Sequence, residues 1–349
     1  MKIKVFRSFM LFIMFLATTQ CSGKASPSPT GIVVQSPTGV SSSPGSTRLP
    51  PTASLPPTQA QQDERTEFES MVDVGGYELY LHCMGTGTPA VIFEAGANDV
   101  SETWSLVLPE VAQFTRACAY DRAGLGHSEA GPEPGDSYQV IQELHTLLTN
   151  ASIEGPYVLV GHSLGGMYMR LFADYYQEKV VGLVLVDSQH IDQFTRFAAV
   201  LPPEAPDDSE NLRFYREWFT NPVTYPELSH GLFEPGSLGD MPLVVLTSPN
   251  KERAADLPAG LSDRWDAIWV ELQEQWAQIS SRSRHIMADG SGHFIQLDQP
   301  DLVIAAIRLV IEDATSTQLT TEEKKLCPYP HNLPAFNLPK RVFRRITNG

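Results

Sequence analysis

Residues 157–165 read Tyr-Val-Leu-Val-Gly-His-Ser-Leu-Gly, an apolar run that leads directly into a Gly-x-Ser-x-Gly motif. The run from Tyr157 to Gly161 predicts a buried strand, and the pattern from Gly166 to Tyr176 predicts a helix. A serine at the tight turn between a strand and a helix is typical of a nucleophile elbow, because glycines two positions away on each side relieve the steric clash. We therefore expect Ser163 to present a nucleophilic hydroxyl, and the Leu164 backbone N–H to point at the place where an oxyanion would form.

Short apolar runs alternate with amphipathic stretches on both sides of this motif. The predicted strands span residues 71–74, 77–83, 90–94, 115–120, 157–161, 181–186, 243–247 and 283–288, and the predicted helices span residues 137–150, 166–176 and 262–280. Gly75-Gly76 between the first two runs predicts a two-residue hairpin turn. Strands that alternate with helices indicate an α/β fold, in which a mostly parallel sheet is covered by helices on both faces.

A serine hydroxyl is a poor nucleophile at neutral pH and needs an adjacent base. Of the nine histidines, His293 is the best placed, because Gly290-Ser291-Gly292-His293-Phe294 follows the last predicted strand. Its ring would then stand on a loop at the same edge of the sheet as Ser163. His162 is next to the serine in sequence but should point away from it into the elbow. We therefore predict that His293 is the general base.

Two further motifs resemble the α/β-hydrolase family. Asp121-Arg122-Ala123-Gly124-Leu125-Gly126-His127-Ser128 is similar to the family's loop after its fourth strand, and Glu94-Ala95-Gly96-Ala97 falls where the family has its oxyanion loop. The order of serine and then histidine also matches, and the resemblance runs from about Val72 to Val310. It implies a mostly parallel eight-stranded sheet, and a second oxyanion N–H from Ala97 beside that of Leu164. This chain has Glu94-Ala95 where many members have a histidine before the glycine.

The third member of the triad, an acid, is less clearly marked. The family usually places it just after the seventh strand, where this chain has Ser248-Pro249-Asn250-Lys251-Glu252 and no aspartate. Some members carry the acid after the preceding strand instead, and Asp187 stands there. A carboxylate is needed to hold the histidine tautomer. We predict Asp187 as the acid, with Glu252 second and Asp256 third; the alternative for Asp187 is a buried strand-end residue bonded to backbone amides.

These residues together predict a serine hydrolase that acts through an acyl-enzyme on Ser163, with carboxylic esters as the expected small-molecule substrates. An amidase or peptidase on the same triad is the alternative within enzymes. A catalytically silent hydrolase fold that binds a ligand or partner is the alternative outside them. Epoxide and haloalkane hydrolases of the same fold use an aspartate as nucleophile, so a serine at position 163 argues against both.

Composition limits the partners. The chain has 25 Lys and Arg against 41 Asp and Glu, a formal net charge of -16. Such a surface repels phosphate backbones, which disfavours nucleic-acid binding and favours a neutral or cationic substrate. The four cysteines form no Cys-x-x-Cys pair and show no spacing with histidine that suits zinc, so we expect neither a metal nor a cofactor.

The first 21 residues resemble an export signal. Lys2, Lys4 and Arg7 precede an apolar run from Phe9 to Ala17, which is far shorter than the ~20 residues of a membrane-spanning helix. Cys21 sits where a lipoprotein signal places its acylated cysteine, although residues 18–20 fit that motif poorly. We expect an exported, extracytoplasmic protein, with a lipid anchor on Cys21 and simple cleavage both left open.

The rest of the chain divides by composition. Residues 22–66 are rich in Ser, Pro and Thr and predict a disordered tether. Residues 67–314 form the expected hydrolase domain, and within them the aromatic insertion 189–240 predicts a lid, or else a helical excursion that packs on the core. Residues 315–349 are a polar tail, expected at the surface or disordered. Trp265, Trp269, Leu272, Trp276 and Ile279 recur at helical spacing and predict the buried face of a helix.

The resemblance also bears on the cysteines, because in this fold the second and fourth strands are neighbours. Cys83 ends the second predicted strand and Cys118 lies in the fourth. Export would permit a disulfide. We expect Cys83 and Cys118 to be bonded and Cys327 to be free; two reduced core thiols are the alternative.

Overall fold

The computed structural model describes residues 66–132, 136–220, 233–249, 257 and 259–326. Contacts divide the chain into Met1–Ser54 and Leu55–Gly349, and every described residue belongs to the second unit. The predicted export signal, the tether up to residue 65, the alternative acids Glu252 and Asp256, and Cys327 lie outside the described residues.

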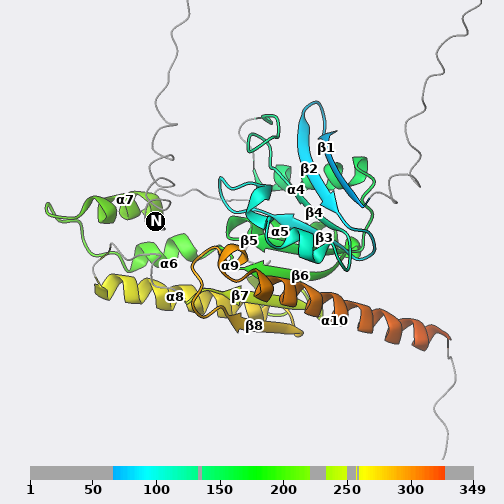
Figure 1. The fold of residues 1–349 in the computed structure, drawn as a ribbon. Helices are drawn as coiled ribbons and strands as arrows, with labels where there is room; N and C mark the ends of the chain where they lie inside the picture. Colours follow the sequence, from blue (N-terminus) through cyan, green and yellow to red (C-terminus); the bar gives the residue numbers. More distant parts are fainter. Residues whose placement is uncertain (1–65, 133–135, 221–232, 250–256, 258, 327–349) are drawn as a thin grey trace, which may run out of the picture. The chain divides into compact units, whose positions relative to one another are not determined.

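Eight strands form one sheet in the order β1-β2-β4-β3-β5-β6-β7-β8 (Figure 1). Their bounds are β1 Glu67–Asp73, β2 Glu78–Met84, β3 Ala90–Glu94, β4 Ala117–Tyr120, β5 Tyr157–His162, β6 Val180–Val186, β7 Leu243–Thr247 and β8 Ser283–Met287. The pairs β1–β2 and β2–β4 are antiparallel, and all other pairs are parallel. This confirms the predicted α/β class and the eight-stranded, mostly parallel sheet.

The turn between β1 and β2 follows from its glycines. Gly75 and Gly76 have φ values of 129° and 105°, which side chains rarely adopt. Both amides donate hydrogen bonds to Asp73 Oδ1, at 2.7 and 2.9 Å. These bonds lower the pKa of the Asp73 carboxyl. The predicted hairpin is therefore present, and Asp73 closes it.

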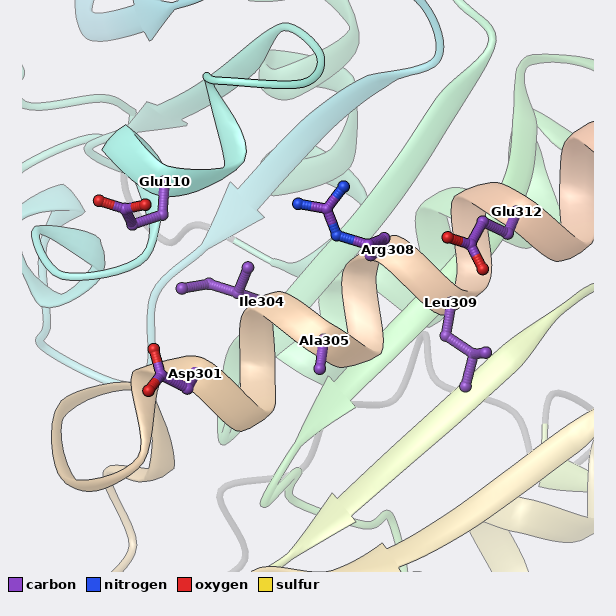
Figure 2. A pocket seen from close by; sticks show the side chains of 7 residues that line it. All are labelled: Glu110, Asp301, Ile304, Ala305, Arg308, Leu309 and Glu312. Carbon is purple, nitrogen blue, oxygen red and sulfur yellow. The ribbon is translucent and has the colours of Figure 1, made fainter.

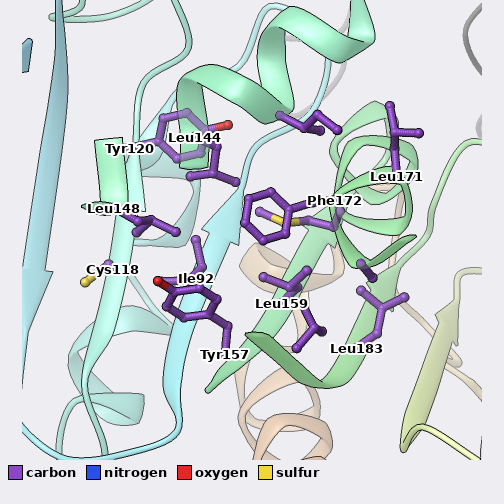
Figure 3. Packing of buried hydrophobic residues seen from close by; sticks show 14 of the residues in the cluster. Ile92, Cys118, Tyr120, Leu144, Leu148, Tyr157, Leu159, Leu171, Phe172 and Leu183 are labelled. Atoms are coloured by element: carbon purple, nitrogen blue, oxygen red, sulfur yellow. The ribbon is translucent and has the colours of Figure 1, made fainter. Parts of the chain in front are cut away.

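Helices cover both faces of the sheet. Their bounds are α3 Leu108–Val111, α4 Ser137–Asn150, α5 Leu164–Tyr175, α6 Gln193–Ala199, α7 Glu210–Thr220, α8 Ala259–Gln278, α9 Ile295–Asp298 and α10 Pro300–Leu326, with 3-10 turns at Ser101–Trp104 and Gln177–Lys179. Alternate residues of the central strands point to opposite faces. Ile92 and Leu159 join a core with α4 and α5, while Phe93 and Val160 join a second core with α10. Figure 3 shows the first of these cores.

The predicted insertion 189–240 contributes α6 and α7, which pack on the first half of α8. A third cluster joins Phe197 of α6 and Phe219 of α7 to Trp265 and Trp269 of α8. The second half of α8 buries Trp276 in the first core. The predicted tryptophan-rich buried face of this helix is therefore confirmed. The insertion's role as a lid stays a prediction.

The last helix crosses the expected boundary between domain and tail at residue 314, because α10 runs from Pro300 to Leu326. No helix is predicted from the sequence over these residues. The hydroxyls of Thr315 and Ser316 donate to the carbonyls of Ile311 and Glu312, one turn back, at 2.8 Å each. Polar residues of this kind satisfy their hydrogen bonds within the helix. Thr315 and Ser316 are exposed, as expected for the start of the polar tail.

Cys83 and Cys118 form a disulfide, as predicted. They are direct partners in the antiparallel register of β2 and β4, with Cα atoms 4.1 Å apart. Both residues are buried. Within the described residues no helix is long and apolar enough to cross a membrane.

Candidate active site

Ser163 lies between the end of β5 and the start of α5, in a backbone conformation with φ 52° and ψ −122°. A positive φ is uncommon for a residue with a side chain and is strained unless its surroundings hold it. The Ser163 amide donates to the Val186 carbonyl at 3.1 Å. Its own carbonyl accepts from the Gly166 and Gln189 amides, at 3.1 and 2.9 Å. Backbone bonds to β6 and to the loop after it therefore fix the elbow.

Three glycines leave room for this turn. A Cβ at Gly161 would lie 2.6 Å from the Gly165 carbonyl oxygen, and one at Gly165 would lie 2.5 Å from the Ala95 carbonyl oxygen. A Cβ at Gly166 would overlap the Ser188 hydroxyl. The first two glycines belong to the motif. In the sequence, Gly166 indicates only the start of a helix. It must be a glycine because Ser188, which lies after β6, occupies the space that a Cβ would need.

His293 and Asp187 are in direct contact. His293 Nδ1 donates to Asp187 Oδ2 at 2.7 Å. Asp187 follows β6 directly, is fully buried and has a φ of 45°. Because Nδ1 faces the carboxylate, the Nε2 edge of the imidazole faces the other way. Among the three candidate acids, Asp187 is the one that lies in the described residues, and it contacts the candidate base.

The second oxygen of this carboxylate is also occupied. Asp187 Oδ1 accepts hydrogen bonds from the Ser248 amide at 3.0 Å and from Trp269 Nε1 at 2.9 Å. Ser248 follows β7, at the position where the family more often places its acid. The sequence predicts Trp269 only as part of a buried helix face. The helical spacing that predicts this face does not indicate what the indole N–H binds.

His162 supports the histidine loop. Its Nε2 donates to the His293 carbonyl at 2.9 Å, and its ring lies 4.9 Å from that of Phe294. The Gly292 amide of the same loop donates to Asp298 Oδ2 at 2.8 Å. His162 is thus buried and bonded to the loop that carries His293. Its place beside Ser163 in the sequence does not indicate this contact.

The loop after β3 lies against the nucleophile. A Cβ at Gly96 would be 3.3 Å from Ser163 Cβ and 3.0 Å from His162 Nδ1, so the Gly96 backbone is the immediate neighbour of the serine. Ala97 follows at an exposed position, and Leu164 is the first residue of α5. Both backbone amides predicted for the oxyanion site are therefore on segments that border Ser163.

A buried ion pair holds this loop. The Arg122 guanidinium binds the Glu94 carboxylate and donates to the carbonyls of Ala95, at 2.8 Å, and Gly96. The Tyr120 hydroxyl donates to the same carboxylate. Burial raises the pKa of Glu94 against the opposing effect of Arg122, and burial together with Glu94 raises the pKa of Tyr120 well above its usual range. Glu94 and Arg122 stand in separate motifs of the sequence, and neither motif indicates that the two residues pair.

The remainder of the loop after β4 is structural. Asp121 Oδ1 accepts from the Ser101 amide at 2.8 Å, and Oδ2 accepts from the His127 amide at 2.9 Å. A Cβ at Gly126, which has a φ of 52°, would overlap the Asp121 carboxylate. The aspartate and glycine of this motif therefore shape the loop and place Arg122.

A surface pocket of about 300 Å³ lies elsewhere, between α3 and α10 (Figure 2). It is lined by Glu110, Asp301, Ile304, Ala305, Arg308, Leu309 and Glu312. None of the candidate catalytic residues borders it. Among the described side chains there is no group of three or more His, Cys, Asp or Glu that could hold a metal ion.

Comparison with known proteins agrees with this fold. A sequence model described as the alpha/beta hydrolase family matches residues 79–306. An uncharacterized protein of Bacillus subtilis, YqjL, is 30% identical over 230 residues, which cover 65% of this chain and 85% of that protein. A solved structure from Acinetobacter baumannii, of a protein described as a lipase candidate, aligns with a TM-score of 0.52 at 17% identity and covers 74% of this chain and 95% of its own.

Other relatives match over a shorter part of their length. A 2-hydroxy-6-oxo-6-(2'-aminophenyl)hexa-2,4-dienoic acid hydrolase from Metapseudomonas resinovorans is 28% identical over 131 residues, which are 37% of this chain and 45% of that enzyme. The chain spans 24% of an uncharacterized vacuolar membrane protein of Saccharomyces cerevisiae. What these longer proteins do as wholes does not carry over.

Proposed function

Because the chain belongs to the alpha/beta hydrolase family, we propose that it is a serine hydrolase that cleaves carboxylic esters through an acyl-enzyme on Ser163. The observation that carries the proposal is the His293–Asp187 hydrogen bond of 2.7 Å beside a strained serine at the end of β5. A nucleophile after one strand, an acid after the neighbouring strand and a base bonded to that acid are the parts of a catalytic triad.

Each residue has a defined step in the proposed reaction. Ser163 Oγ attacks the ester carbonyl while His293 Nε2 takes the hydroxyl proton. Asp187 keeps the proton of the neutral imidazole on Nδ1 and stabilises the imidazolium that forms. His293 then protonates the departing alcohol. Water enters, loses a proton to His293 and attacks the acyl-enzyme, which releases the acid and restores Ser163.

The negative charge that develops on the carbonyl oxygen needs fixed donors. The Leu164 and Ala97 amides are proposed to supply them. Leu164 is the first residue of α5, so the partial positive charge of that helix terminus acts at the same place. Loss of one such donor in comparable sites costs roughly 10²–10³ in rate.

Esters are proposed ahead of amides because the aligned Acinetobacter protein is described as a lipase candidate. The net charge of -16 favours neutral or cationic substrates of either kind over anionic ones. Two alternatives to ester hydrolysis stay open. An amidase or peptidase would use the same residues. The Metapseudomonas relative is named as a hydrolase of a dienoic acid, which is the second alternative substrate class.

One experiment separates these possibilities. The chain is treated with a fluorophosphonate probe, which modifies activated serines, and the labelled peptide is mapped. It is then assayed on p-nitrophenyl esters of graded chain length, on the matching anilides and on a 2-hydroxy-6-oxo-dienoate. We expect the label on Ser163 and turnover of esters. Turnover of anilides or of the dienoate alone would replace the ester assignment, and absence of both labelling and turnover would indicate a silent binding protein.

A further inference from the structure

We propose that Trp269 is a positioning residue of this active site: its indole N–H fixes the Asp187 carboxylate and thereby orients His293. The proposal rests on the proposed function, in which Asp187 is the triad acid. The helical spacing of Trp269 indicates only a core residue of α8. The proposal adds that this residue affects catalysis.

The evidence begins with how the carboxylate is divided. Oδ2 is bound to His293 Nδ1 at 2.7 Å. Oδ1 is bound to Trp269 Nε1 at 2.9 Å and to the Ser248 amide at 3.0 Å. Asp187 is fully buried and Trp269 is 4% exposed. Hydrogen bonds to an ionised group are stronger than neutral ones, and burial strengthens them further.

Two donors on one oxygen fix the rotation of the carboxylate about its bond to Cβ. Without the indole N–H, Oδ1 would lose one of these donors, and the direction of Oδ2 toward His293 would be less defined. The carboxylate would also keep more of its negative charge on Oδ2. Both changes act on the histidine and leave the substrate's contacts with the protein as they were.

The position of the indole depends on the packing of α8. Trp269 belongs to the cluster that joins α8 to α6 and α7. One turn earlier, the ring of Trp265 lies 5.0 Å from those of Phe197 and of Phe219. The Trp269 ring itself lies 6.3 Å from the His293 imidazole. One side chain thus connects the helices of the insertion to the buried acid.

Trp265 provides a matched control. It is on the same helix, in the same cluster and equally buried, at 4% exposure. Within the described residues its Nε1 has no hydrogen-bond acceptor. Trp265→Phe and Trp269→Phe therefore make the same chemical change in the same surroundings, and only the second removes a donor from Asp187.

The experiment compares wild type, Trp269→Phe and Trp265→Phe in ester hydrolysis across pH. For Trp269→Phe we expect kcat to fall about tenfold, the effect of one hydrogen bond to a charged group, with KM within about twofold. The acidic limb of its pH–kcat/KM profile should move to higher pH, because a carboxylate with fewer donors stabilises the imidazolium more. Among the described residues, two other titratable groups are close to His293 or its loop: the ring of His162 lies 4.6 Å from that of His293, and Asp298 of α9 accepts from the Gly292 amide. Both are retained in all variants.

Trp265→Phe should stay within about twofold of wild type in kcat and KM, with an unchanged pH profile. Equal effects of the two substitutions on kcat and on the pH profile would overturn the proposal. If Trp269→Phe does not fold, 3-benzothienylalanine at position 269 keeps the bicyclic ring and lacks the N–H, and the same results are expected. Asp187→Asn, measured alongside, separates failure of the proposed triad from failure of the role of Trp269. If Asp187→Asn is as active as wild type, the triad assignment fails. If Asp187→Asn is inactive while Trp269→Phe is unaffected, only the role of Trp269 fails.

Discussion

The carboxylate of Asp187 is fully buried. It accepts hydrogen bonds from His293, Trp269 and the Ser248 amide. A buried aspartate bonded to backbone amides is common in structural roles. Here two side chains also donate to it, and one of them is the imidazole of the candidate base.

Asp187→Asn should lower kcat by roughly 10⁴, because the amide would hold the wrong tautomer of His293. Glu252→Gln, the control at the alternative position, should leave kcat within about twofold. Both variants are measured on the same ester at the pH optimum. The reverse ranking would move the acid to the segment after β7 and leave Asp187 structural.

The Glu94–Arg122 pair permits a test that separates stability from positioning. Glu94→Gln leaves the buried guanidinium without its counter-charge, and we expect a loss of about 3–5 kcal/mol in the free energy of unfolding by urea. In the double variant Glu94→Gln/Arg122→Met both charges are gone, so much of that stability should return.

Activity should not return with it. The Ala95 and Gly96 carbonyls lose their donor in the double variant, so the loop beside Ser163 is no longer held. We expect kcat to stay at least about tenfold below wild type, which is the scale of one lost hydrogen bond to a charged group. A stable double variant with wild-type kcat would show that the pair only supports the fold.

At the scale of elements, much of the fold could be predicted because buried parallel strands read as continuous apolar runs. The strands at 90–94 and 243–247 and the helix at 137–150 begin and end where the sequence indicates. The end of α10 could not be predicted, because the sequence after Ala314 is polar and lacks the apolar periodicity that would mark a helix.

The partners of the site residues were harder to predict than their positions. Ser163, Asp187 and His293 are visible as candidates because each follows a strand, and the carboxyl ends of parallel strands share one edge. The bond from Trp269 to Asp187 and the pairing of Glu94 with Arg122 depend on the register and packing of separate elements. No spacing within the chain encodes these contacts.

The junction of β5 and α5 gives a prediction for an element. Gly166→Ala should place a methyl group against Ser188 and lower the free energy of unfolding by about 1–3 kcal/mol, as overpacking does. It should lower kcat as well, because the elbow must shift. Gly260→Ala on α8, where a Cβ would meet nothing within 4 Å, is the control.

Alanine at position 260 should be neutral or stabilise the chain by up to about 1 kcal/mol, as in other helices. Urea unfolding of both variants provides the comparison. Equal stability and activity of the two would mean that the elbow tolerates a side chain at position 166 and that its geometry is looser than the contacts indicate.

At the scale of the whole molecule, the disulfide and the N-terminal sequence point to the same compartment. Disulfides persist in oxidising surroundings and are rare in the cytosol. The Cys83–Cys118 bond joins two neighbouring core strands. We propose that the protein is exported and that residues 22–66 tether the hydrolase domain.

Fractionation of cells that express the full chain tests this proposal. We expect the protein outside the cytoplasm, with Cys83 and Cys118 protected from alkylation until a reductant is added. Cys21→Ser should release it into the medium if that cysteine carries a lipid. An uncleaved cytoplasmic product would contradict export, whereas localisation that is unaffected by Cys21→Ser would contradict only the lipid anchor.

The central claim is that the hydroxyl at the elbow performs the chemistry, and Ser163→Ala tests it most directly. The variant is compared with wild type and with Ser70→Ala, a serine on the edge strand β1, in hydrolysis of a p-nitrophenyl ester and in thermal unfolding. We predict that Ser163→Ala loses about 10⁴–10⁶ in kcat with an unchanged Tm, and that Ser70→Ala retains wild-type activity. Ester hydrolysis by Ser163→Ala within tenfold of wild type, in protein with the wild-type Tm, would contradict the account.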